Sequence, residues 1–379
     1  MDFNLNEEQK AIQAMVKEFA KNEVEPIAAE IDKTMEFPIE NVRKMGKIGL
    51  MGMMVPKEYG GAGAGAVGYV TAIEEISKVC ASTGVIMSVN NSLACYPLQT
   101  FGTEEQKQKF LKPIASGEKL GAFGLTEPSA GTDAGSQAST AVLDGDHYVL
   151  NGSKVFITNG CDADTFIVFA MTDKSKGMRG ISAFVLEKGT PGFTLGKYED
   201  KLGIRASGQV ELFFSDCRIP KENLIGKVGA GFKIAMMTLD GGRIGIAAQA
   251  VGIAQAAMEE SIKYAKERVQ FGRPIATKQA IQWMIADMAT KIEASRLLLH
   301  RAAAVKDAGK RYSYEAAMAK LVASETAMEV TTKAIQIHGG YGYTKDYAVE
   351  RFFRDAKITE IYEGTSEVQR MVISGTLLK

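Results

Sequence analysis

The sequence is poor in the residues that build disulfide frameworks and metal sites. Its 379 residues include four cysteines, which are far apart and form no Cys-x-x-Cys pair, and three scattered histidines. Disulfide-rich domains and structural zinc sites need closer or repeated spacing. We therefore expect reduced thiols and no metal site, and a catalytic triad built on histidine is not the first expectation.

Net charge and long apolar runs are also missing. Lys plus Arg and Asp plus Glu both number 45, so no overall positive field attracts nucleic acid or an anionic membrane. No run reaches the roughly 18 apolar residues that span a bilayer, and the amino terminus lacks the segments of a signal peptide. These absences predict a cytoplasmic protein without a nucleic-acid or membrane partner.

Several common catalytic and nucleotide-binding motifs are absent. The sequence has no Gly-x-x-x-x-Gly-Lys-Ser/Thr loop, no Gly-x-Gly-x-x-Gly between a strand and a helix, and no Gly-x-Ser-x-Gly. A P-loop enzyme, a Rossmann-type nicotinamide domain and a serine hydrolase are therefore unsupported.

Hydrophobic periodicity divides the chain into three segments. Residues 1–119 are predicted to form an N-terminal all-α domain, in which Asn6 and Gln9 match a capping box at the start of the first helix. Residues 226–379 contain long helical segments at 244–268, 279–306 and 314–337, which predict a C-terminal four-helix bundle.

The middle segment, residues 120–225, has the pattern of short strands. Its β-rich runs are separated by Asp144-Gly145, Asn151-Gly152 and Pro191-Gly192, dipeptides that are typical of tight turns. This punctuation favours an antiparallel sheet or small barrel over a parallel doubly wound sheet. The expected fold class is therefore α+β and multidomain, with a middle antiparallel β domain.

Three turns combine glycine with polar side chains. The turn Gly124–Asp133 offers N–H groups and three hydroxyls, which suit either a cofactor edge or an ordinary interdomain loop. Gly241 and Gly242 lie where a bundle helix is expected to begin, and each costs about 1 kcal/mol relative to alanine. The segment Gln336–Gly342 has more glycine than a helix cap needs. Both glycine clusters indicate close approach of a ligand or another helix.

The final segment places Glu363 in the sequence Ile361-Tyr362-Glu363-Gly364-Thr365. Tyrosine and glycine neighbours favour partly apolar surroundings, and burial raises the pKa of a carboxyl group toward the range useful to a general base. Considered alone, a solvated loop glutamate is the commoner interpretation.

Six motifs occur in an order that resembles the acyl-CoA dehydrogenase family from end to end of the chain. They are Phe123–Pro128, Phe156–Thr158, Asp240–Arg243, Arg268–Gly272, Gln336–Gly340 and Ile361–Thr365. One alone would be weak, whereas six in register are highly specific. The likeness is greatest to short-chain, butyryl-CoA dehydrogenases and enoyl-CoA reductases of anaerobic bacteria.

The resemblance implies roles for these residues. Glu363 resembles the catalytic base, whereas Thr132, Asp240, Arg243 and Gly364 resemble substrate contacts. FAD is the implied cofactor, and part of its site is expected to come from across a subunit interface. The residues that resemble FAD contacts are Phe123, Leu125, Thr126, Thr132, Phe156, Ile157, Thr158, Arg268, Phe271, Gln279, Gln336, Ile337, Gly339, Gly340, Thr365 and Glu367.

Two positions bear on this resemblance. Phe156 stands where many family members have tryptophan, which keeps an aromatic face but removes an indole N–H donor. Some relatives carry their catalytic glutamate just before the position of Arg243 and lack the one in the last motif. Here that position is Gly242 and Glu363 is present, which is consistent with Glu363 as the base.

The resemblance implies an FAD-dependent oxidoreductase that interconverts a short-chain acyl-CoA and its 2,3-enoyl-CoA. Glu363 would exchange the α-proton while a β-hydride passes to or from flavin N5. The implied partners are an electron-transferring flavoprotein and further copies of the chain in a homotetramer, with enoyl-CoA reduction as the expected direction. The alternatives are an aryl-acrylyl-CoA substrate, an acyl-CoA oxidase and, less favoured, a non-enzymatic scaffold.

Overall fold

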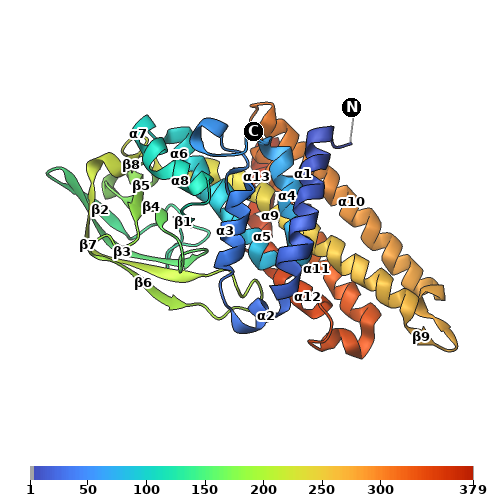
Figure 1. Cartoon of the computed structure of the whole chain (residues 1–379). Helices are drawn as coiled ribbons and strands as arrows, with labels where there is room; N and C mark the ends of the chain where they lie inside the picture. Colours follow the sequence, from blue (N-terminus) through green and yellow to red (C-terminus); the bar gives the residue numbers. More distant parts are fainter. Residues whose placement is uncertain (1–3, 379) are drawn as a thin grey trace.

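The sheet and the tips of the longest helices lie at opposite ends of the molecule in the computed structural model, which describes residues 4–378 (Figure 1). The three longest helices are α9 (Gly231–Glu267), α10 (Gln279–Asp307) and α11 (Ser313–His338). They pack on one another and extend away from the sheet (Figure 1). The predicted fold class is confirmed: an N-terminal helical domain, a middle sheet and a C-terminal helical domain.

The N-terminal helical domain packs on α9 through α4 (Gly65–Val79) and the segments that follow it. The predicted capping box at the start of α1 (Glu7–Phe19) is present, since Asn6 accepts from the N–H of Gln9 at 2.8 Å and Gln9 returns a bond of 3.0 Å. Helix α4 packs directly on α9. The other elements are α2 (Glu25–Thr34), α3 (Ile39–Lys47), α4 (Gly65–Val79), α5 (Ala81–Ser88), a π-helical segment η4 (Val89–Cys95), α6 (Tyr96–Phe101), α7 (Glu104–Gln106) and α8 (Lys112–Ala115).

The middle sheet is mostly antiparallel. Its strands lie in the order β6-β7-β3-β2-β4-β5-β8, and β1 pairs with β4. Two pairings are parallel: β1 with β4, and β2 with β4. The strands are β1 (Gly121–Gly124), β2 (Thr140–Asp144), β3 (His147–Ile157), β4 (Thr165–Met171), β5 (Ile181–Glu187), β6 (Phe193–Tyr198), β7 (Val210–Pro220) and β8 (Leu224–Ile225).

The turn predicted at Asn151-Gly152 is wrong. Both residues lie inside β3, at a register shift in its pairing with β7. The Asn151 side chain bonds across the ladder, donating to Asp216 Oδ1 at 3.1 Å and accepting from the Asp216 N–H at 2.8 Å. A β-bulge, rather than a turn, therefore accounts for the glycine.

Helix α9 begins earlier than predicted. The expected start at Ile244 is wrong, because the helix begins at Gly231 and carries Gly241 and Gly242 inside it. The expectation treated these glycines as a helix boundary. They are tolerated in the interior because neighbouring side chains occupy the space where their own would project. The chain then continues through α12 (Val349–Thr359) and α13 (Ser366–Leu377).

A buried ion pair connects the sheet to the loop that follows β1. Lys154 in β3 is fully buried, and its Nζ donates to Glu127 Oε1 at 2.7 Å and to Leu125 O at 3.2 Å. The Glu127 carboxylate also accepts the N–H groups of Ala138 at 2.6 Å and Ser139 at 3.2 Å. This network fixes the loop that carries Thr126 and Thr132.

We expect Lys154→Met to destabilise the chain by about 3–5 kcal/mol, because it leaves the Glu127 charge buried without its partner. Adding Glu127→Gln removes that charge and should recover part of the loss. Urea denaturation of the single and double variants measures both effects. Equal destabilisation by the two variants would show that the uncompensated charge is not the cause.

Candidate active site

Glu363 lies in the tight loop between α12 and α13. Its backbone has a φ of 53°, a conformation that costs a residue other than glycine on the order of 1 kcal/mol or more. Three bonds hold the loop in place: Gln369 Nε2 donates to Gly364 O at 2.8 Å and to Glu363 O at 3.3 Å, and Lys320 Nζ donates to Gly364 O at 2.8 Å. The strained backbone therefore fixes the direction of the Glu363 side chain.

The Glu363 side chain points at α9. A Cβ built on Gly242 would lie 1.7 Å from Glu363 Oε2 and 3.0 Å from Leu93 Cδ2, so the carboxylate occupies the space that glycine leaves free. Oε2 is buried and has no hydrogen-bond partner among residues 4–378. A buried carboxylate oxygen without a partner is costly, which is typical of functional sites rather than of structural ones.

Burial and nearby cations set the protonation of this carboxyl group. Loss of solvation raises the pKa of Glu363 from its ordinary 4.5 to about 8, against the opposing effect of Lys320 and Arg243. Burial also lowers the pKa of Lys320 to about 8, although Glu363 opposes that shift. Glu363 can therefore release or take up a proton near neutral pH.

The predicted substrate contacts on α9 lie one turn from Glu363. Arg243 is buried, and its Nη1 donates to Asp240 Oδ1 at 2.6 Å, while Asp240 Oδ2 accepts from Ser313 Oγ. Arg243 Nε has no partner within the described chain. Arg243 and Glu363 are thus brought together, with the Nε donor of the guanidinium still available.

A second group of predicted site residues lies at the sheet. Phe156 has a φ of 61° and leaves 61% of its surface exposed, although it is a large aromatic residue. Its carbonyl accepts from Gln209 Nε2 at 3.1 Å, and the same amide reaches Thr158 Oγ1 at 3.4 Å. The Thr126 carbonyl accepts the N–H of Val155 at 2.9 Å. An exposed ring beside fixed polar groups fits the face of a planar cofactor.

The other predicted residues of this region differ in exposure. Thr132 is exposed in the loop after β1, where it is free to meet a ligand. Phe123 is buried against Phe169, with ring centroids 5.1 Å apart. Leu125 and Ile157 are also buried. The predicted residues of this region therefore include buried side chains that pack beneath the surface as well as exposed ones that form it.

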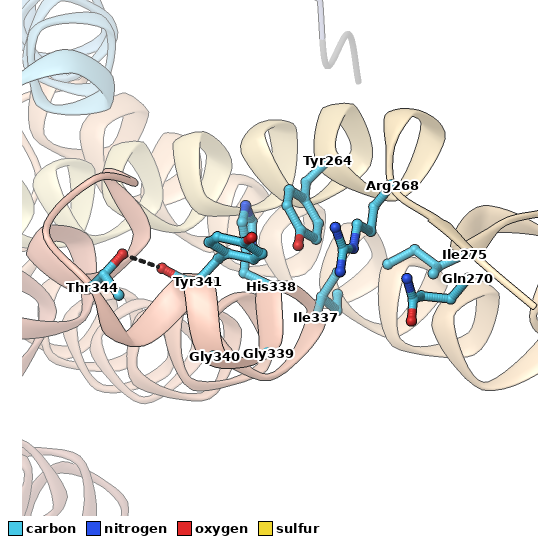
Figure 2. A pocket seen from close by; sticks show the side chains of 10 residues that line it. All are labelled: Tyr264, Arg268, Gln270, Ile275, Ile337, His338, Gly339, Gly340, Tyr341 and Thr344. Atoms are coloured by element: carbon cyan, nitrogen blue, oxygen red, sulfur yellow. Dashed lines mark hydrogen bonds between the residues drawn. The ribbon is translucent and has the colours of Figure 1, made fainter.

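A third group lines a cavity of about 520 Å³ at the far tip of the bundle (Figure 2). Tyr264 near the end of α9 and Arg268 just after that helix extend toward Tyr341 and the backbone of Gly339 and Gly340 (Figure 2). The Arg268 guanidinium lies 5.4 Å from the centre of the Tyr341 ring. A Cβ on Gly339 or Gly340 would have no atom of this chain within 4 Å. A cation, aromatic rings and open glycine backbone together suit an anionic ligand with a planar group.

More predicted residues lie around this tip. Phe271 is 92% exposed with a φ of 53°, in the hairpin of β9 (Val269–Gln270) and β10 (Arg273–Pro274). Gln279 begins α10 and is exposed, as is Gln336 near the end of α11, whereas Ile337 is buried.

The sheet group and the tip group are not brought together within one chain. Figure 1 shows β9 and the sheet at opposite ends of the molecule, joined by the length of α9. The last predicted contacts, Thr365 and Glu367, lie beside Glu363, where Thr365 accepts from the N–H of Val368 at 3.4 Å as the cap of α13. The predicted cofactor contacts therefore form separate half-sites.

Sequence reasoning missed Lys320, a cation that is hydrogen-bonded to the loop of Glu363. The available signal was its position on a face of α11 that is rich in small residues, where Ala316, Ala317 and Ala323 are buried. A lysine on such a face needs an internal acceptor, and Gly364 O supplies it.

Two classes of site are not found in the described residues. No cluster of three His, Cys, Asp or Glu side chains is suited to hold a metal ion between residues 4 and 378. None of the helices in that range is long and apolar enough to cross a membrane.

Comparison with known proteins identifies the same architecture. The chain matches the N-terminal domain of acyl-CoA dehydrogenase over residues 6–118, its middle domain over 122–217 and its C-terminal domain over 229–378. It is 62% identical to a short-chain specific acyl-CoA dehydrogenase of Clostridium acetobutylicum, over 100% of both chains. It is 52% identical to an acryloyl-CoA reductase (NADH) of Anaerotignum propionicum, over 100% of this chain and 96% of the relative.

A solved structure is similar to this chain in both sequence and fold. One chain, from work on the electron transferring flavoprotein of Acidaminococcus fermentans and flavin-based electron bifurcation, superposes with a TM-score of 0.99. It is 60% identical, and the match covers 100% of both chains.

We expect Lys320→Met to raise the pKa of Glu363 above about 8, because the substitution removes the cation that favours the ionised carboxylate. Infrared titration of the protonated carboxyl band, assigned by its loss in Glu363→Gln, measures this pKa. Lys291→Met, which removes a surface partner of Glu329, is the matched control and should leave the band unchanged. An unshifted band in Lys320→Met would mean that the lysine does not act on the base.

Proposed function

The chain belongs to the acyl-CoA dehydrogenase family, an oxidoreductase family acting on CH–CH bonds, and we propose that it interconverts a short-chain acyl-CoA and its 2,3-enoyl-CoA with Glu363 as the proton-transfer residue. The observation that carries this proposal is the buried Glu363 Oε2, which has no hydrogen-bond partner among the described residues, in a carboxyl group whose pKa is raised to about 8. A group of that kind accepts the α-proton in oxidation and returns it in reduction.

The residues present fit FAD, which the family implies. The exposed Phe156 ring with Thr126 and Thr158 would hold its planar part, and Arg268 with the Gly339–Gly340 backbone would hold its anionic part. When bound, FAD supplies flavin N5 as the acceptor or donor of the β-hydride.

The loop around Glu363 supplies the remaining chemistry. Its backbone N–H donates no hydrogen bond within residues 4–378, so it is free to bind a thioester carbonyl. Such a bond makes the α-C–H more acidic, while the positive φ aims the carboxylate along the face of α9. Arg243 and Asp240 are placed to receive the CoA portion nearer the surface.

We propose reduction of a short enoyl-CoA as the main direction. The similarity to an enzyme named acryloyl-CoA reductase supports this direction. The similarity to a chain studied with an electron transferring flavoprotein supports such a flavoprotein as the electron-transfer partner.

We further propose a homo-oligomer, a homotetramer by family resemblance. The separation of the sheet half-site from the tip half-site supports this proposal, because one chain carries both halves at opposite ends (Figure 1). A second copy would bring the tip of one chain to the sheet of the other and complete a cofactor site.

Glu363→Gln should lower turnover by roughly 10²–10⁴-fold while FAD and acyl-CoA still bind, because the amide cannot exchange the proton. Steady-state rates with butyryl-CoA and an artificial electron acceptor, together with flavin absorbance, measure this. Near-normal turnover would overturn the assignment.

The same variant should be more stable than the parent at pH 8. The unfolded parent ionises Glu363 above its ordinary pKa of 4.5, whereas the folded parent retains the proton until about pH 8. The parent therefore loses stability, on the order of a few kcal/mol, as pH rises through this window, and the glutamine variant does not. Urea denaturation at pH 5 and pH 8 tests the difference. An equal pH dependence in both proteins would contradict burial of the group.

Subunit complementation tests the shared cofactor site. Phe156→Ala and Arg268→Ala should each weaken FAD binding by roughly tenfold. A mixed oligomer of the two variants contains some sites with both halves intact, so it should regain part of the FAD retained on gel filtration. If the mixed oligomer retains no more FAD than either variant alone, the two half-sites do not combine across subunits, and the proposed shared site is wrong.

A further inference from the structure

One face of α9 continues from Glu363 into the core. Gly242 and Gly245 lie three residues apart on this face, and Gln249 follows one turn later. The Glu363 carboxylate lies against Gly242, and the hydroxyls of Tyr69 and Ser88 lie against Gly245. The two hydroxyls therefore lie three residues further along α9 than the carboxylate, a rise of roughly 4.5 Å along the helix axis.

The polarity of α9 sets the direction of the substrate. Glu363 contacts α9 at Gly242. Asp240, which precedes this contact along α9, is partly exposed and charged, whereas every residue from Ile244 to Ala254 is buried. A charged CoA group must leave toward the exposed end, because burying it in the apolar end would cost several kcal/mol. The apolar acyl chain, with its α-carbon at Glu363, consequently extends toward Gly245.

Tyr69 and Ser88 close that route. Both side chains are fully buried, and their hydroxyls are hydrogen-bonded to each other at 2.9 Å. A Cβ on Gly245 would lie 2.4 Å from each of the two hydroxyl oxygens, so no open space separates them from α9. They satisfy one another and present no unpaired polar group to an acyl chain.

Gln249 and its hydrogen-bond partners form a second buried layer next to the Tyr69–Ser88 pair. Gln249 is fully buried, its Nε2 donates to Ala81 O at 2.8 Å, and its Oε1 accepts from the Tyr362 hydroxyl. Displacing Tyr69 or Ser88 toward α9 would therefore break a packed and hydrogen-bonded layer rather than enter free volume.

We propose that the Tyr69–Ser88 hydroxyl pair is the floor of the acyl pocket and sets the upper limit of chain length. The proposal rests on the proposed function, since it assumes that the α-carbon is bound at Glu363. It assigns a short, unbranched acyl group as the substrate class and disfavors an aryl group at the β-carbon.

The double variant Tyr69→Phe/Ser88→Ala removes both hydroxyls together, so neither is left unpaired. We expect its kcat/KM for hexanoyl-CoA, relative to butyryl-CoA, to rise by roughly tenfold over the parent value, the scale of discrimination per methylene in an apolar pocket. Steady-state rates of the FAD-loaded protein with propionyl-, butyryl-, hexanoyl- and 3-phenylpropionyl-CoA measure the profile.

Gly245→Ala tests the same floor from the opposite side. Its added methyl group pushes the hydroxyl pair toward the acyl chain, so the ratio of propionyl-CoA to butyryl-CoA rates should rise. Tyr148→Phe, which removes the hydroxyl of a largely buried tyrosine in the sheet domain, is the matched control and should keep the parent profile. Flavin absorbance confirms that each variant is folded, and the Gly245 result stands if the double variant is not.

The outcomes separate this proposal from the proposed function. A parent protein that oxidises no acyl-CoA of the panel overturns the proposed function and the floor with it. An active parent whose chain-length profile is unchanged in the double variant, or in Gly245→Ala if only that variant folds, overturns the floor alone. A parent that uses hexanoyl- or 3-phenylpropionyl-CoA as well as butyryl-CoA also overturns the floor.

Discussion

Burial of one carboxylate oxygen, Glu363 Oε2, without a hydrogen-bond partner in residues 4–378 is the constraint on which the candidate site depends. Ionisation of the carboxyl group in that position is unfavourable, although Lys320 and Arg243 act to lower the pKa of Glu363. The surrounding structure keeps the group there: a strained backbone aims it, the Lys320 and Gln369 bonds hold the loop, and Gly242 leaves the necessary space. The reactivity of the site and its cost in stability have the same origin.

The long bundle helices relate this local constraint to the whole molecule. Helix α9 carries the proposed substrate contacts near its first third, and the proposed cofactor contacts lie at its end, separated by most of its length. A helix of this kind holds two sites at a fixed separation, because its backbone hydrogen bonds make it stiff. The sheet contributes its half-site through short loops, which are held by the buried Lys154–Glu127 pair. Rigid elements therefore position every group that the proposed reaction needs.

Much of this arrangement follows from the sequence, and the misses have physical causes. Helical periodicity predicted α10 and α11 to within one residue, because their exposed and buried faces alternate regularly. The start of α9 and the bulge at Gly152 were mistaken because glycine marks both boundaries and close packing, and only tertiary contacts distinguish them. Glu363 was found from its motif. Lys320 and Tyr69 were not, because each contacts residues distant in sequence, and single-sequence patterns contain no such pairing.

The contact between Glu363 and Gly242 also links what can stand at these two positions. The two positions share one volume, since even a Cβ at residue 242 would overlap Glu363 Oε2. Any side chain at residue 242 would therefore displace the Glu363 carboxylate from its present position. The absence of a side chain on α9 is thus as much a part of the site as the presence of the acid in the loop, and a change at residue 242 would alter the placement of Glu363 without touching the loop itself.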